Sequence, residues 1–131
     1  MTDYRNLDVY KEAYELYLQT TRLSLKFPYP FDREIGSQLR RAALSIILNI
    51  AEGYGRKDST LEFQHFLRNS LGSANEVKVL LEISHDLALL TNETYQSLSE
   101  RYEIVGKKLF RLRLSWKGKN NQPKSIESPK K

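Results

Sequence analysis

Apolar residues recur at alternating steps of three and four along almost the whole chain, and no stretch alternates with period two for long enough to form a strand. Residues that far apart share one face of an α-helix, so the pattern predicts helices throughout. The longest such run begins at a capping box, Ser59 to Glu62, and its phase continues through Gly72 and Ser73, which predicts one long helix. The core positions it selects are Phe63, Leu67, Ser70, Ala74, Val77, Leu81, Ser84 and Ala88.

Glycine and proline divide this pattern into separate helices. Pro28 and Pro30 separate the first helix from the second, and Gly53 and Gly55 stand where the second ends. These two glycines are candidate C-cap positions, where a positive φ is tolerated. Helices of this length with short connections form an up-down-up-down antiparallel four-helix bundle, so the predicted fold class is all-α. The predicted helices span about 7–26, 34–54, 59–88 and 93–116.

The charge of the chain is concentrated near its C-terminus. The net charge is +5, but residues 1–100 hold 11 Lys/Arg against 14 Asp/Glu, and residues 101–131 hold 10 against 2. Residues 117–131 contain one apolar side chain, Ile126, and cannot bury enough surface to offset the entropy of ordering. We therefore predict a bundle domain over 1–116 and a disordered, lysine-rich tail over 117–131.

The composition also limits where and how the protein works. The chain has no cysteine, which excludes disulfides, thiolate metal sites and cysteine nucleophiles. It has no apolar run of about 18–20 residues and no signal-peptide pattern at its N-terminus. These features predict a cytoplasmic protein that does not enter a membrane.

Two E-x-x-H motifs, Glu62 to His65 and Glu82 to His85, are the sequence features closest to an enzymatic site. Di-iron bundles place such motifs on two helices, with a further carboxylate on each of two others. Here both motifs fall on one predicted helix, about 30 Å apart at 1.5 Å per residue. Neither histidine belongs to a pattern typical of a catalytic triad. We therefore expect no metal, no cofactor and no enzymatic activity.

Basic side chains offer a possible contact with nucleic acid. They are either a solvated surface or a set of phosphate contacts, which would be salt-sensitive and without base-specific readout. The candidates are Arg40, Arg41, Arg56, Lys57, Arg101, Lys107, Lys108 and Arg111.

A polar ridge follows the flank of the second predicted helix at helical spacing: Arg41, Ser45, Asn49 and Glu52. These side chains either satisfy one another and neighbouring helices, or form a recognition surface. A second apolar stripe lies on the opposite side of the third helix from its core face and would be exposed in a monomer. We predict that it is an oligomer interface, because exposed apolar stripes are usually covered by a partner. Its residues are Leu80, Ile83, Leu87 and Leu90.

The amino-acid sequence of the second and third predicted helices resembles that of a bacterial family, the proteins encoded in intervening sequences of 23S ribosomal RNA genes. The resemblance rests on residues 37–43 (SQLRRAA), Ser45-Ile46 and 49–56 (NIAEGYGR), followed by Glu62-Phe63, Phe66-Leu67, Gly72-Ser73 and Glu76. It extends over roughly residues 7–116. The family is related to the accessory variability determinant of diversity-generating retroelements.

The resemblance implies a four-helix bundle that assembles as a ring-like homopentamer and has no established catalytic activity. The retroelement relatives present a basic surface to nucleic acid and contact a reverse transcriptase, so RNA or DNA and a reverse transcriptase are implied partners. Two functions follow: an oligomeric module that contacts nucleic acid, or a protein-interaction scaffold that does not.

Overall fold

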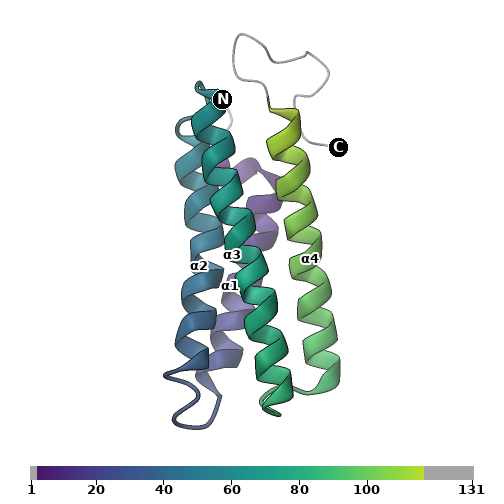
Figure 1. The fold of residues 1–131 in the computed structure, drawn as a ribbon. Helices are drawn as coiled ribbons and strands as arrows, with labels where there is room; N and C mark the ends of the chain where they lie inside the picture. Colours follow the sequence, from purple (N-terminus) through teal and green to yellow (C-terminus); the bar gives the residue numbers. More distant parts are fainter. Residues whose placement is uncertain (1–2, 117–131) are drawn as a thin grey trace.

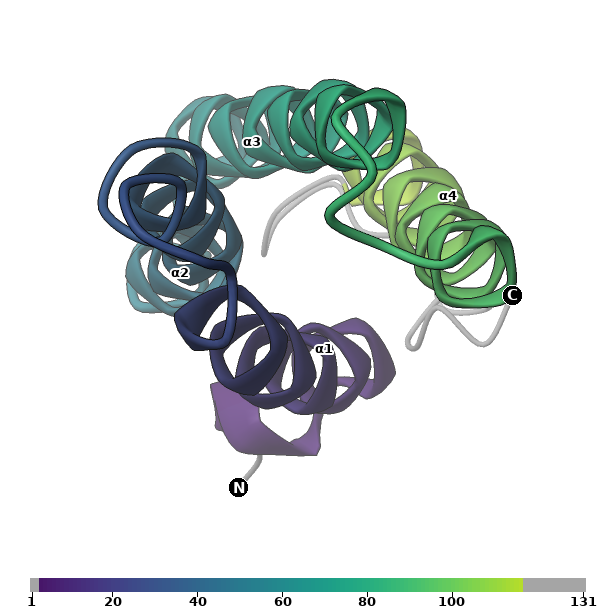
Figure 2. The same cartoon turned by 90° about the horizontal axis from the view of Figure 1, so that it is seen from below.

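The fold was analysed in a computed structural model, which describes residues 3–116. A short 3-10 helix, η1 (Tyr4–Asn6), precedes four α-helices. Successive helices run antiparallel (Figure 1) and follow one another around the bundle axis, so that α1 lies between α2 and α4 (Figure 2). The all-α four-helix bundle is confirmed, and residues 3–116 contain no strand. The helices are α1 (Asp8–Leu25), α2 (Ile35–Tyr54), α3 (Thr60–Asp86) and α4 (Asn92–Ser115). The prediction about the tail concerns residues outside the described part.

The heptad positions predicted for α3 form the centre of the core. Seven of the eight are buried, from Phe63 to Ser84. The exception is Ala88, which is exposed because α3 ends at Asp86. The chain reverses there with Ala88 at φ 63°, and the Leu89 N–H donates to the Ser84 carbonyl at 2.8 Å, the hydrogen bond of a Schellman motif.

This reversal also corrects the predicted apolar stripe. Leu90 turns back into the core after the helix end and is buried within the subunit. Leu80 is buried as well, because α3 packs against both α2 and α4 and its buried sector is wider than one heptad face. Of the four stripe residues, Ile83 and Leu87 remain exposed.

The two glycines near the end of α2 do not have the predicted conformation. Gly55 is the C-cap residue, but its φ is −65°. Gly53 lies inside α2 and is buried, since α3 passes too close for a side chain: a Cβ there would lie 2.8 Å from Phe66 Cβ. Gly53 therefore serves helix packing and not helix termination. The same interface is joined by the Ser70 hydroxyl, which donates to the Ile46 carbonyl at 2.8 Å.

Three aromatic rings close one end of the bundle. The rings of Phe63 and Trp116 meet edge to face with centroids 4.9 Å apart, and Tyr54 lies 5.9 Å from Phe63. The Trp116 indole N–H also donates to the Lys57 carbonyl at 3.1 Å. This aromatic corner (Tyr54, Phe63 and Trp116) joins the ends of α2 and α4 to the start of α3.

The edge between α1 and α4, here called the polar edge, is the least extensively packed edge of the bundle and holds several polar contacts. At its centre the hydroxyls of Thr20 and Tyr102 form a buried hydrogen bond of 2.7 Å. Burial raises the pKa of Tyr102 to about 12, so its hydroxyl stays protonated at neutral pH. Within residues 3–116, no helix is both long and apolar enough to cross a bilayer.

Candidate nucleic-acid interface

Several of the side chains predicted to contact phosphates instead form hydrogen bonds or ion pairs within the subunit. Arg40 is half-buried and donates to the Ser24 hydroxyl at 2.9 Å and the Asp32 carbonyl at 3.1 Å. It thereby ties the start of α2 to the end of α1. Arg41 stays exposed on α2, with a hydrogen bond of 3.0 Å to Ser37.

Near the end of α2, two further cations contact side chains of their own subunit. Arg56 forms ion pairs with Glu52 at 2.6 Å and Glu62 at 3.3 Å, and these carboxylates raise its pKa. Lys57 places its ammonium 4.5 Å from the centroid of the Tyr54 ring. Both residues therefore stabilise the connection between α2 and α3.

Two of the predicted contacts on α4 hold the polar edge with α1. Lys108 donates to Asp8 at 2.5 Å and to Glu12 at 3.2 Å, and the hydrogen bond with Asp8 raises the pKa of Lys108. Arg101 donates to the side-chain oxygen of Gln19 at 2.7 Å. The charge of Lys108 is therefore compensated, and both side chains are oriented toward α1.

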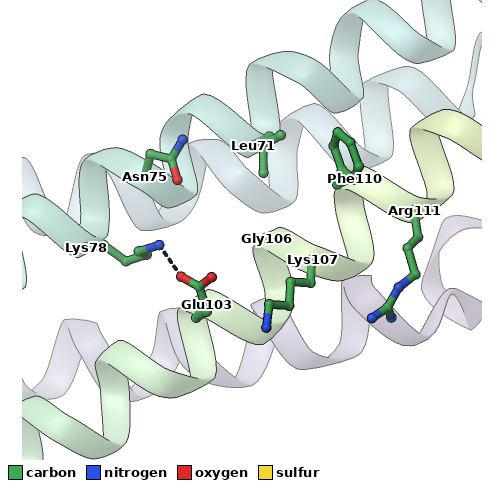
Figure 3. A pocket seen from close by; sticks show the side chains of 8 residues that line it. All are labelled: Leu71, Asn75, Lys78, Glu103, Gly106, Lys107, Phe110 and Arg111. Carbon is green, nitrogen blue, oxygen red and sulfur yellow. Dashed lines mark hydrogen bonds and ion pairs between the residues drawn. The ribbon is translucent and has the colours of Figure 1, made fainter.

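Lys107 and Arg111 are the remaining pair, and they lie one turn apart on the exposed side of α4. Within the described residues, neither forms an ion pair or a hydrogen bond. Both line an open groove of about 390 Å³ between α3 and α4 (Figure 3). The groove is lined by Leu71, Asn75, Lys78, Glu103, Gly106, Lys107, Phe110 and Arg111.

The groove is positively charged because only one of its four ionisable side chains is acidic. That residue, Glu103, pairs with Lys78 across the groove (Figure 3). The hydrogen bond with Lys78 lowers the pKa of Glu103, and the charge of Lys107 adds to the effect. The sequence analysis did not single out Phe110, which is 45% exposed and stands on the α3 side of α4, whereas the ends of Lys107 and Arg111 point away from it (Figure 3). The sequence feature that could have identified Phe110 is its position, because it is an aromatic residue on the polar side of an amphipathic helix.

The histidines of the two E-x-x-H motifs have different neighbours. His85 stacks on Tyr95 with ring centroids 4.6 Å apart, and His65 lies 3.4 Å from the Asn69 amide. Among residues 3–116, no three His, Cys, Asp or Glu side chains are grouped so that they could hold a metal ion.

Comparison with known proteins gives the family. The model of the 23S rRNA-intervening sequence protein family matches residues 5–111 and so includes all the groove residues. The chain belongs to this family. A solved structure from the S23 ribosomal protein family of Bacteroides thetaiotaomicron VPI-5482, titled a protein with unknown function, has the same fold with a TM-score of 0.73. It is 24% identical, and the alignment covers 81% of this chain and 95% of that one. No curated protein matches.

In this member of the 23S rRNA-intervening sequence protein family, two residues of the polar ridge, Ser45 and Asn49, bond to each other, and Ser45 also bonds to the neighbouring helix. The Asn49 amide donates to the Ser45 carbonyl at 2.9 Å and to its hydroxyl at 3.0 Å, and Ser73 on α3 donates to the same hydroxyl at 2.8 Å. Glu52 holds Arg56, as described above. Within the NIAEGYGR run, Gly53 therefore serves the packing of α2 on α3, whereas the side-chain hydrogen bonds of Asn49 stay within α2.

Proposed function

We propose that this protein is a non-enzymatic, oligomeric helical module that contacts nucleic acid through the exposed edge of α4. The observation that carries the proposal is the pair of cations, Lys107 and Arg111, that no carboxylate in residues 3–116 engages in an ion pair. Side chains one helical turn apart are neighbours, so both reach the same stretch of a phosphate backbone. Five lysines in residues 117–131 add positive charge to the chain.

Binding of this kind is expected to be salt-sensitive, because each phosphate that a side chain neutralises releases counterions. Replacing Lys107 and Arg111 together with alanine should reduce the slope of log affinity against log salt by about 2, one for each phosphate that the variant no longer neutralises. Fluorescence anisotropy of labelled RNA and DNA over a series of salt concentrations measures this slope.

The matched control is a double alanine variant of Lys11 and Arg22, two exposed cations on the outer side of α1. It removes the same charge and should leave the slope largely unchanged. An equal loss in the control variant, or no binding by the wild type at low ionic strength, would refute the proposed interface.

The oligomer is proposed from an apolar stripe that the subunit leaves uncovered. Val79, Ile83 and Leu87 are spaced four residues apart at the C-terminal end of α3 and are 54%, 38% and 46% exposed. A contiguous apolar stripe of this kind usually marks a contact with a partner. A second copy of the chain is the proposed partner, and the family resemblance implies a ring of five.

Substituting both Ile83 and Leu87 with glutamate should dissociate the oligomer, since the new carboxylates would have to be buried without partners at every repeated interface. Size-exclusion chromatography with light scattering should then give the mass of one subunit, 15.3 kDa. Leu114→Glu, at an exposed apolar position on α4, is the control and should keep the oligomeric mass. A wild-type protein that is monomeric at micromolar concentration would contradict this proposal.

The second candidate function is a protein-interaction scaffold that does not bind nucleic acid. The same exposed stripe on α3 supports it, and a reverse transcriptase is the partner implied by the retroelement relatives. A pull-down with and without nuclease treatment separates the two functions, because only capture through nucleic acid disappears after the treatment.

A further inference from the structure

We propose that the groove between α3 and α4 binds single-stranded nucleic acid, with a base stacked on Phe110 and phosphates on Lys107 and Arg111. This inference rests on the proposed function and assigns the form of nucleic acid that this site takes. Three features of the groove carry it: an exposed ring, an opening beside that ring, and an uncompensated charge.

The exposed ring is Phe110, whose neighbours on α4 are basic. Its side chain stands in the groove across from Leu71 (Figure 3), and nearly half of it is accessible. The Arg113 guanidinium lies 5.6 Å from the ring centroid. Aromatic rings beside cations are the usual platform of single-strand sites, because every base has a face that stacks and every nucleotide has a phosphate.

The opening beside the ring comes from Gly106. It lies in the middle of α4, where glycine is less favourable than alanine. Nothing in the subunit requires it: a Cβ there would meet only Leu71 Cδ1, at an ordinary contact distance of 3.5 Å. The absent side chain keeps the groove, of about 390 Å³, open next to Phe110.

The polar groups of the groove match a nucleotide better than a peptide. Lys78 and Glu103 neutralise each other, which leaves Lys107 and Arg111 as net positive charge. The groove walls are helices, whose backbone groups are already hydrogen-bonded and unable to pair with an extended peptide. What they offer is a ring, two cations and the Asn75 amide, which fit a base face, a phosphate and a base edge.

A duplex does not fit this arrangement, since its bases are already stacked inside the helix and only its phosphates reach the protein. The single strand is therefore the form that gains from Phe110. Stacking on one aromatic ring corresponds to about 5- to 150-fold in affinity.

The test compares a labelled single-stranded RNA, the corresponding single-stranded DNA and a duplex of the same sequence, by anisotropy at low salt. The full-length wild type should bind single strands more tightly than the duplex. Phe110→Ala should weaken single-strand binding about 5- to 150-fold and leave duplex binding unchanged, and Phe110→Trp should retain single-strand binding. Gly106→Leu, which keeps the ring and both charges but fills the groove, should reproduce the loss.

Leu114→Ala is the control, because it removes an equally exposed apolar side chain from the next turn of α4. Circular dichroism and thermal melting show whether each variant is folded. Because the Phe110 and Gly106 variants act on the groove by different means, failure of one to fold leaves the other as the test.

Three results would overturn the inference. Equal binding of single strands and duplex, unchanged in the Phe110 and Gly106 variants, would leave the proposed function standing and remove the base site. Displacement of the single strand by poly-glutamate as effectively as by unlabelled strand would show a general site for anionic chains. A change of subunit number in either variant, seen by light scattering, would show that the groove is a contact between copies. Absence of all binding at low salt would instead refute the proposed function itself.

Discussion

Phe63→Ala is expected to lower the free energy of unfolding by about 3–5 kcal/mol, the range found when a fully buried phenylalanine is truncated. The side chain has no exposed surface and contacts the rings of Tyr54 and Trp116 in the aromatic corner. Its loss opens a cavity where three helices meet. Since domains of this kind are stable by about 5–15 kcal/mol, the variant should lose a large share of its stability.

Chemical denaturation followed by circular dichroism measures this loss. Trp116 is the one tryptophan of the chain, so its fluorescence reports directly on the same corner. Leu61→Ala is the matched control, because Leu61 lies two residues earlier on α3 and is 80% exposed. Its effect should stay within about 0.5 kcal/mol. Similar losses in the two variants would show that the corner does not contribute as described.

Gly53→Ala should destabilise the bundle by about 1–3 kcal/mol, although alanine is the better helix former. The new Cβ would lie 2.8 Å from Phe66 Cβ and 3.0 Å from Phe63 Cδ1. Phe66 Cβ is bonded to the backbone, so the contact is relieved only if α3 moves away from α2. Thermal melting compared with the wild type measures the effect.

Gly72→Ala is the control that separates packing from helix propensity. Gly72 is exposed in the middle of α3, and a Cβ there would meet nothing within 4 Å. This variant should gain about 0.5–1 kcal/mol, since alanine loses less backbone entropy on folding. A change of the same sign at both glycines would argue against close approach at Gly53.

The periodicity of the sequence was sufficient to predict the helix count, the order of the helices and most of the core, because a buried helix face requires apolar residues at a regular spacing. It was insufficient where the chain stops being a helix. The heptad phase continues formally to Ala88, but the reversal there exposes Ala88 and buries Leu90. Periodicity also does not distinguish a glycine that ends a helix from a glycine, such as Gly53, that allows a second helix to approach closely.

The candidate site was harder to predict, because whether a basic side chain is paired depends on residues far away in the sequence. Lys108 and Asp8 are 100 residues apart, and Arg101 and Gln19 are 82 apart, so a count of basic residues on one helix does not reveal these pairings. Lys107 and Arg111 were among the predicted residues and lie in the groove. Phe110 and Gly106 were missed, since on a helical wheel both fall on the solvent side.

The polar edge between α1 and α4 has a consequence for the motions of the bundle. Apolar helix interfaces resist separation in any salt, whereas the contacts of Lys108 and Arg101 exchange with water and are screened by ions. We therefore expect local opening to begin along this edge, so that in a native-state hydrogen-exchange experiment the amide protons of α1 and α4 exchange earlier than those of α2 and α3. The hairpin of α2 and α3, whose mutual packing is the most extensive in the bundle, is then expected to be the last part of the fold to separate.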